Sequence, residues 1–206
     1  MQDDFLKDIN FEVTEIFKSL QGEGVDSGSP AVFVRLAGCN LSCQFCDTKF
    51  PVNMKLSGVQ LLKQILDIAG GTRLIVFTGG EPLLQPVIQL VPILRGMGLY
   101  VGVETNGTIE VDPVFFTSLS LSPKVPFMKC KVQRCHSLKL LYPYLHGATP
   151  EDYKSVYAGY RFIQPIWVEG DMVRTKQIIQ EAAAEVMRLG DGWKLGLQIH
   201  KFIGIQ

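Results

Sequence analysis

The chain has 206 residues, of which 47% are hydrophobic and 19% charged, and its formal net charge is zero. This composition excludes an intrinsically disordered chain and predicts one domain spanning residues 1–206, since domains commonly contain about 100–200 residues. The sequence has no polybasic run, which argues against direct nucleic-acid binding, and no apolar run of the roughly 18 residues that span a membrane. The acidic start Met1–Asp4 is unlike a secretory signal, so we expect a cytoplasmic protein without a membrane partner.

Short apolar runs predict six or seven strands along the chain. In chain order they are Ala31–Leu36, Leu74–Phe77, Leu99–Val103, Leu119–Leu121, Leu138–Leu141 and Arg161–Ile166, with Lys194–Gln198 as a further candidate. Runs that are apolar on both faces are typical of parallel strands covered on both sides.

Helical patterns lie between these strands. The first has apolar residues at helical spacing, namely Leu62, Ile65, Leu66 and Ala69. Ser57 and Gln60 form a capping box before it. A second helix follows Leu84 and should be kinked at Pro92. A third helix runs from about residue 171 to residue 190. Alternating strands and helices predict an α/β fold, and the reduced helix count predicts an incomplete, splayed (β/α) barrel of mostly parallel strands, or a curved open sheet.

Polar or glycine-rich residues follow five of the predicted strands. These segments are Gly38-Cys39, Thr78–Pro82, Glu104–Gly107, Ser122–Lys124 and Gln164-Pro165, the last of which continues directly from Arg161–Ile163. Because parallel strands end on one edge, and such folds bind ligands there, we expect a functional site at this edge. Arg35 lies inside an apolar run, so it should bind either a substrate carboxylate or a buried structural partner.

Three of the five cysteines lie within eight residues, with the spacing C-x3-C-x2-C: Cys39, Cys43 and Cys46. Clustered thiols of this kind favour metal binding over disulfides or buried structural cysteines. A structural zinc ion would need a fourth ligand, whereas a cubane cluster on three thiolates leaves one iron open for catalysis. Cys130 and Cys135 fit no motif and are expected to be structural or free thiols.

These motifs resemble those of the radical S-adenosylmethionine (SAM) enzymes. The cysteine spacing, with Phe45 before the last cysteine, is similar to the family's signature, and Thr78–Pro82 (TGGEP) is similar to its glycine-rich segment. Further segments resemble one branch of it, the 7-carboxy-7-deazaguanine synthases: Glu15–Gly24, Val32–Asn40, Phe45–Thr48, Val103–Gly107, Ser122–Lys124 and Leu197–Gly204.

The resemblance implies an activity and its cofactors. A [4Fe-4S] cluster on the three clustered cysteines would bind SAM and cleave it reductively to a 5′-deoxyadenosyl radical. This radical would start the ring contraction of 6-carboxy-5,6,7,8-tetrahydropterin to 7-carboxy-7-deazaguanine with loss of ammonia, a step of queuosine and deazapurine biosynthesis. Mg²⁺ is implied beside the substrate carboxylate, with Thr48 as its protein ligand.

The resemblance also implies contacts with the cofactor and the substrate. The implied SAM-binding residues are Phe45, Cys46, Asp47, Gly80, Glu81, Glu104, Ser122, Pro123, Lys124 and Gln164. The implied substrate-binding residues are Leu20, Gln21, Gly22, Glu23, Arg35, Thr78 and Gln206. Glu81 could accept a hydrogen bond from the methionine ammonium or occupy a helix N-terminus. Gln206 stands where this family usually ends in proline, and its free α-carboxylate is implied in pterin binding.

Partners follow from the same resemblance, and other functions remain open. An electron donor such as flavodoxin or ferredoxin and a homodimer are implied. The alternatives are a glycyl-radical enzyme activase, which shares the cysteine motif, and a non-catalytic iron–sulfur or zinc-binding module. The pterin-type segment Leu20–Gly24 and the C-terminal segment argue against the activase.

Overall fold

The computed structural model describes residues 6–44, 46, 48–145 and 148–206. The chain divides into two compact units. The first comprises the described residues up to Leu20, Ser29–Thr105 and Val114–Ser118, and the second comprises Gln21–Gly28, Asn106–Pro113 and the described part of Leu119–Gln206. Within the described ranges, no helix has the length and hydropathy needed to cross a membrane.

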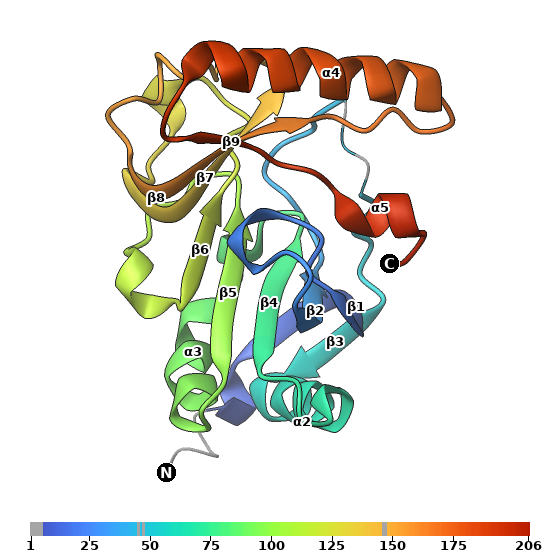
Figure 1. The fold of residues 1–206 in the computed structure, drawn as a ribbon. Helices are drawn as coiled ribbons and strands as arrows, with labels where there is room; N and C mark the ends of the chain where they lie inside the picture. Colours follow the sequence, from blue (N-terminus) through green and yellow to red (C-terminus); the bar gives the residue numbers. More distant parts are fainter. Residues whose placement is uncertain (1–5, 45, 47, 146–147) are drawn as a thin grey trace. The chain divides into compact units, whose positions relative to one another are not determined.

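The first unit contains a mixed sheet. Its strands are β1 (Asn10–Leu20), β2 (Pro30–Leu36), β3 (Met54–Ser57), β4 (Leu74–Gly79) and β5 (Tyr100–Thr105), in the order β3-β1-β2-β4-β5. β2, β4 and β5 are parallel and lie side by side, while β1 is antiparallel to β2 and β3 (Figure 1). Leu36 pairs with Gly79, so the carboxyl ends of β2 and β4 meet at one edge.

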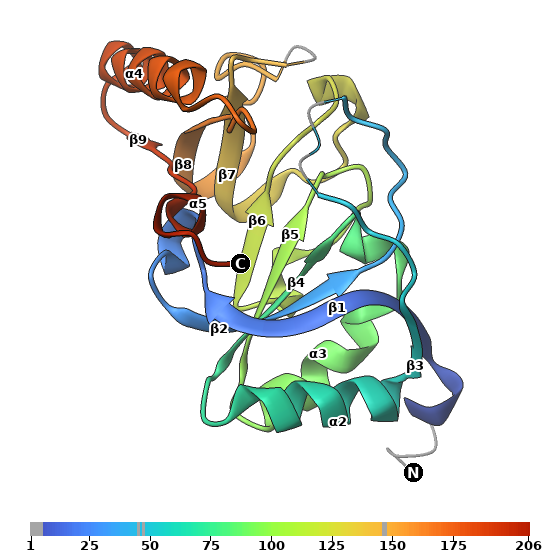
Figure 2. The same ribbon diagram turned by 90° about the vertical axis from the view of Figure 1, so that its right-hand side faces the viewer.

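Two α-helices and two short 3₁₀ helices complete the first unit. They are α2 (Gly58–Ala69), η2 (Pro82–Leu84), α3 (Val87–Gly96) and η3 (Pro113–Phe115). The expected capping box starts α2: the Ser57 hydroxyl accepts from the Gln60 amide at 3.3 Å, and the Gln60 side chain accepts from the Ser57 amide at 2.8 Å. α2 packs beneath β1 and α3 packs against β5 (Figure 2). Pro92 lies within α3, and the kink expected there stays a prediction.

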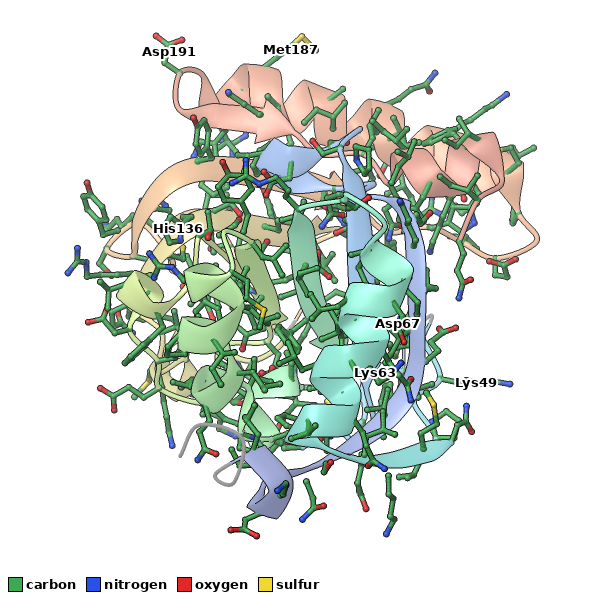
Figure 3. The ribbon with its side chains drawn as sticks, turned by 90° about the horizontal axis from the view of Figure 1, so that it is seen from below. Lys49, Lys63, Asp67, His136, Met187 and Asp191 are labelled. Atoms are coloured by element: carbon green, nitrogen blue, oxygen red, sulfur yellow. The ribbon has the colours of Figure 1, made fainter. Side chains whose placement is uncertain are left out.

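The outer face of α2 is polar. Figure 3 shows Lys63 and Asp67 on this face, one helical turn apart. Their side chains are 74% and 60% exposed and form an ion pair at 2.5 Å. The opposite face of the helix buries Leu61, Ile65 and Ala69. Of the predicted apolar stripe, Ile65 and Ala69 therefore lie in the core, whereas Leu62 is half-buried and Leu66 is 41% exposed.

The second unit contains a parallel sheet. Its strands β6 (Ser118–Leu121), β7 (Arg134–Tyr142), β8 (Tyr157–Pro165) and β9 (Trp193–Leu195) are ordered β6-β7-β8-β9. Its helices are η1 (Gly24–Asp26), η4 (Phe127–Lys129), α4 (Met172–Leu189) and α5 (Ile199–Ile203). α4 packs against β8 and β9, and the Asp171 side chain caps it by accepting from the Arg174 amide at 2.8 Å.

All seven predicted strands are present, although β9 ends at Leu195 rather than Gln198. Two further strands in the described residues, β1 and β3, were not predicted. Both are antiparallel, and a bulge between Val13 and Glu15 shifts the register of β1. A bulge breaks the alternation of apolar and polar residues that identifies a half-buried strand, which is why the pattern of β1 was not recognised.

Candidate functional site

The cysteine loop leaves the carboxyl end of β2 in the first unit. Cys39 and Cys43 are partly exposed, Cys46 is exposed, and none of the cysteines forms a disulfide. The Cys46 amide donates to the Cys43 carbonyl at 3.1 Å, and the Leu41 amide donates to the Cys39 sulfur at 3.4 Å. Phe45 and Asp47, both implied in SAM binding, lie outside the described residues.

The donor set of this loop fits an iron–sulfur cluster. Across residues 6–44, 46, 48–145 and 148–206, no three His, Cys, Asp or Glu side chains converge into a preformed metal site. The loop supplies three thiols at C-x3-C-x2-C spacing, and thiolates are the protein ligands of iron–sulfur clusters. The fit therefore rests on the ligand chemistry, and three cysteines would leave one cluster iron without a protein ligand.

The glycine-rich segment after β4 is held against the start of this loop. The Gly80 amide donates to the Leu36 carbonyl at 3.3 Å, and the Glu81 amide donates to the Gly38 carbonyl at 3.0 Å. A Cβ atom on Gly80 would lie 1.9 Å from the Gly38 carbonyl oxygen, and one on Gly79, whose φ is +124°, would lie 2.2 Å from that of Leu36. Both positions therefore require glycine, because backbone atoms occupy the space of a side chain.

Glu81 is fully buried at the N-terminus of η2. Its Oε1 atom accepts hydrogen bonds from the Leu83 amide at 3.1 Å and the Thr105 hydroxyl at 2.9 Å. The helix-capping role, one of the two alternatives for this residue, is thus present in the structure, and the contact with a methionine ammonium stays a prediction.

Two other expected contacts of the first unit have protein partners. The Thr78 hydroxyl donates to Glu104 Oε2 at 2.9 Å, so an expected substrate residue orients an expected cofactor residue. Arg35 forms an ion pair with Glu15 at 2.7 Å and lies over the Phe17 ring, 5.5 Å from its centre. The structural ion pair expected as one alternative for Arg35 is present, and its binding of a substrate carboxylate stays a prediction.

A buried charge pair joins the loop after β1 to β7 in the second unit. Lys139 donates to Glu23 Oε2 at 2.5 Å, and Gln198 donates to Glu23 Oε1 at 2.8 Å. Gln164 also donates to the Glu23 carboxylate. Burial alone would raise the pKa of Glu23, but the charge of Lys139 and these hydrogen bonds outweigh it and lower the pKa from 4.5 to about 2. Glu23 is therefore an anion at neutral pH.

The neighbours of Glu23 along the chain hold the C-terminal segment in the same unit. Gln21 is buried, and its side-chain oxygen accepts from the Glu23 amide at 3.1 Å. The Gly22 carbonyl accepts from the Ile199 amide at 3.0 Å, and a Cβ atom on Gly22 would lie 1.9 Å from Nδ1 of His200. This close approach requires a glycine. Leu20, the remaining residue of the expected group, is the last residue of β1.

The other expected residues of the second unit lie at strand ends or at the chain end. Ser122, Pro123 and Lys124 follow β6, and Lys124 donates to the Ser122 hydroxyl at 2.5 Å. Gln206 is exposed at the end of the chain, beyond α5. Nothing in the described residues tests their expected contacts with SAM or the pterin, which stay predictions.

Sequence reasoning missed Lys139 and Gln198. The signal for Lys139 was available, because it interrupts the apolar run Leu138–Leu141 in the same way that Arg35 interrupts the run of β2. A charge at such a position needs a partner. Gln198 carries no comparable signal, since an amide after a short strand is ordinary. The structure also joins two residues for which different roles are expected. Gln164 is expected to bind SAM and Glu23 to bind the substrate, yet their side chains form a hydrogen bond.

Comparison with known proteins supports both the motif and the fold. A family model described as the Radical SAM superfamily matches residues 33–114. The crystal structure of QueE from Escherichia coli superposes with a TM-score of 0.70 at 24% identity, covering 97% of this chain and 99% of that one. This likeness and the strand directions within each unit confirm the expected fold class, a mostly parallel, incomplete, splayed barrel with few helices.

The cysteine loop, the glycine-rich segment and the family match define a radical SAM protein, so a [4Fe-4S] cluster and SAM are its cofactors. The curated 7-carboxy-7-deazaguanine synthase of Bordetella pertussis is 34% identical over 95% of this chain and 99% of that protein. The protein of the same name from Bradyrhizobium diazoefficiens is 36% identical over 96% of this chain and 100% of its own length. The chain belongs to the 7-carboxy-7-deazaguanine synthase family.

Proposed function

We propose that this chain, acting as a single radical SAM domain, converts 6-carboxy-5,6,7,8-tetrahydropterin to 7-carboxy-7-deazaguanine with loss of ammonia. The observation that carries the proposal is the backbone contact of Gly80 and Glu81 with Leu36 and Gly38, which places the glycine-rich segment against the start of the cysteine loop. Family membership supports the particular reaction and argues against the glycyl-radical activase and the non-catalytic module.

On the cofactor side, Cys39, Cys43 and Cys46 would hold the cluster. The absence of side chains at Gly79 and Gly80 lets the glycine-rich segment lie directly against the backbone of Leu36 and Gly38, at the start of the cysteine loop. When bound, the cluster would supply the electron for reductive cleavage of SAM, and SAM would supply the radical chemistry that takes a hydrogen atom from the substrate. The protein orients the participants: the Thr78 hydroxyl fixes the Glu104 carboxylate, which is then available to a cofactor hydroxyl or amine.

On the substrate side, the proposal assigns pterin recognition to the Gln21–Glu23 segment and to the α-carboxylate of Gln206. A pterin presents a flat edge of N–H donors and carbonyl acceptors. The ionised Glu23 carboxylate offers only acceptors to such an edge, and Gln21 and Gly22 precede it directly in the chain. Arg35 keeps donor capacity beyond its bond to Glu15, since a guanidinium carries five N–H groups.

Mg²⁺ with Thr48 as protein ligand is part of the same proposal. The Thr48 carbonyl accepts a hydrogen bond from the Cys46 sulfur at 3.4 Å, so this residue lies directly beside the last cluster ligand. A neutral oxygen ligand suits Mg²⁺, which keeps water and substrate oxygens in its coordination shell. Turnover should rise with Mg²⁺ while SAM binding hardly changes, and Thr48→Ala should weaken that response. Wild-type rates that do not change with a chelator would contradict this assignment.

The physiological setting belongs to the proposal too: a cytoplasmic homodimer served by a donor such as flavodoxin or ferredoxin. The odd number of cysteines, three of them clustered, supports a reducing compartment, because a secreted disulfide framework usually has an even number. Sedimentation of the cluster-loaded protein tests the dimer, and SAM cleavage driven by each reduced donor tests the partner.

The decisive experiment is anaerobic turnover of the carboxytetrahydropterin by the reconstituted enzyme with SAM and a reductant. We expect 7-carboxy-7-deazaguanine and ammonia in equal amounts. Metal analysis accompanies it: about four irons per chain support the enzyme, whereas one zinc per chain would favour a binding module. SAM cleavage that a protein substrate stimulates, and the pterin does not, would favour the activase.

A further inference from the structure

Lys139 and Glu23 form an ion pair that is almost completely withdrawn from water. Their side chains are 4% and 14% exposed, and their charged atoms lie 2.5 Å apart. Lys63 and Asp67 on α2 form a pair of the same length, but at 74% and 60% exposure. The two pairs therefore have the same N–O distance and differ in their exposure to water, which makes the exposed pair a matched control.

A buried ion pair is a costly way to join two chain segments. Desolvating both charges commonly cancels their attraction, and apolar residues of similar size stabilise a protein as well or better. The Lys139 side chain, in β7, is itself 4% exposed, so an apolar side chain of similar size would suit its position. Packing alone does not account for a lysine there.

The hydrogen bonds around Glu23 fix its orientation and its charge. Lys139 donates to Oε2 and Gln198 donates to Oε1, so both carboxylate oxygens are held. These donors come from β7 and from the segment after β9, 116 and 175 positions away along the chain. Because every one of these contacts is a donor to the carboxylate, the arrangement keeps Glu23 ionised inside the protein.

Beside the satisfied Glu23 carboxylate, the Gln164 carbonyl lacks a hydrogen-bond donor among the described residues. Gln164 is 4% exposed and uses its amide N–H group on Glu23, which directs its carbonyl oxygen elsewhere. That oxygen, Oε1, is buried and accepts no hydrogen bond within the described part of the chain. A Cβ atom on Gly196 would lie 3.2 Å from it, so glycine keeps the space beside the oxygen open. A buried acceptor without a donor is costly, and a ligand N–H group would satisfy it.

We propose that Lys139 is a positioning residue for substrate recognition: it holds Glu23 as a fixed carboxylate, so that Glu23 and the Gln164 carbonyl together select a flat heterocycle with N–H donors along one edge. This inference rests on the proposed function, in which that heterocycle is the pterin. Such an arrangement disfavours analogues that lack the donors, because the Gln164 carbonyl would then stay buried and unpaired and the fixed Glu23 carboxylate would face a group that cannot donate.

Binding to the cluster-loaded enzyme with SAM, but without reductant, tests the inference under anaerobic calorimetry. Lys139→Met should weaken the affinity for 6-carboxytetrahydropterin about 10-fold to 150-fold, the loss expected for a charge-assisted hydrogen bond. Lys139→Arg should recover most of the affinity, and the control Lys63→Met should leave it unchanged. In turnover, Lys139→Met should raise KM and leave SAM affinity unchanged. Equal pterin affinity in Lys139→Met and the wild type would overturn the inference.

A double variant separates positioning from mere stability. Lys139→Met leaves a buried unpaired carboxylate and should lower Tm, whereas adding Glu23→Gln removes that charge and should restore much of it. Pterin affinity should stay low in the double variant, and Lys139→Met should add no further loss when Glu23→Gln is already present. Recovery of Tm and affinity together would mean that Lys139 only stabilises the fold.

Gln198→Leu is a second test that keeps the charge pair. It removes one donor to Glu23 but leaves Lys139 and Gln164 to hold the carboxylate, so pterin binding should weaken only about 2-fold to 12-fold, less than on loss of Lys139. Unchanged affinity there would contradict the need for an oriented carboxylate. Wild-type enzyme that cleaves SAM but neither binds nor turns over the pterin would overturn the proposed function and this inference together. Wild-type turnover with an unaffected Lys139→Met would overturn the inference alone.

Discussion

The cysteine-loop edge of the first unit and the Glu23 network of the second unit differ in how the sequence connects their parts. Backbone hydrogen bonds hold the cysteine-loop edge together: the amides of Gly80 and Glu81 donate to carbonyls of the segment that leads into Cys39. The Glu23 network is held by side chains, and Glu23 has partners 116 and 175 positions away. The backbone edge needs glycine and thiols at fixed positions, whereas the network needs matched charge and hydrogen-bonding capacity.

This difference predicts two kinds of failure. Changes at the cysteine-loop edge remove a cofactor ligand or force backbone atoms apart, so they should abolish or strongly reduce all chemistry. Changes in the Glu23 network alter a charge or one donor, so they should give graded losses in substrate affinity. Variants that break this division would show that the two regions do not have separate roles.

The largest effect is expected at the cluster ligands. Cys39→Ala, Cys43→Ala or Cys46→Ala should abolish SAM cleavage, because each removes one of three thiolates. Cys130→Ala and Cys135→Ala are the controls and should keep it, since both thiols are buried and burial raises the pKa of each, that of Cys135 to about 12. Absorbance of the iron–sulfur chromophore after anaerobic reconstitution gives a second readout. A Cys39 variant with a full cluster and normal cleavage would contradict the assignment.

Gly80→Ala should have the next largest effect. Its Cβ atom would lie 1.9 Å from the Gly38 carbonyl oxygen and 2.9 Å from the Cβ atom of Cys39, so the backbone must move. Overpacking of this kind commonly costs about 1–3 kcal/mol of stability. We expect a lower Tm and weaker SAM binding, measured by calorimetry. Gly96→Ala, where a Cβ atom would meet nothing, is the control and should change neither.

The same contrast explains how far the sequence alone could predict the site. The cysteine loop and the glycine-rich segment are contiguous motifs, so the spacing of their residues is enough to identify them. The Glu23 network depends on which strands become neighbours, and no local pattern states that Lys139 and Gln198 reach the same carboxylate. Only the charge of Lys139 within an apolar run signalled a buried partner.

The fold shows a similar division. The parallel strands were predicted because their runs are apolar on both faces, whereas the half-exposed antiparallel strands β1 and β3 were missed. The expectation of one domain stays a prediction, since each unit is compact by itself. The motifs therefore predicted the parts that bind the cofactor better than the parts that would distinguish substrates.

Loss of the C-terminal carboxylate should also reduce substrate affinity by a limited amount, without affecting the cofactors. Deleting Gln206, or adding a C-terminal tag, should raise the KM for the pterin about 10-fold to 150-fold through loss of a charge-assisted hydrogen bond. Cluster content and SAM binding should not change. Phe202 and Ile203 are 47% and 54% exposed, so the segment contributes little to the core and Tm should stay the same. A tagged enzyme with normal affinity would show that the tail only packs.

The smallest effect is expected on the stability of the protein at acid pH, because protonation of Glu23 removes no cofactor ligand. The pKa of Glu23 is lowered from 4.5 to about 2, so its contribution to the free energy of unfolding is complete above pH 4.5 and is lost as the pH falls towards 2. Glu23→Gln lacks this titration, so the stability gap between it and the wild type should be constant at neutral pH and shrink across that window. Urea unfolding at each pH measures the gap, which one such group limits to about 3 kcal/mol. Asp67→Asn, at the exposed pair, should give only a small gap because exposed ion pairs add little. A gap for Glu23→Gln that stays constant down to pH 2 would show that Lys139 does not hold a buried carboxylate.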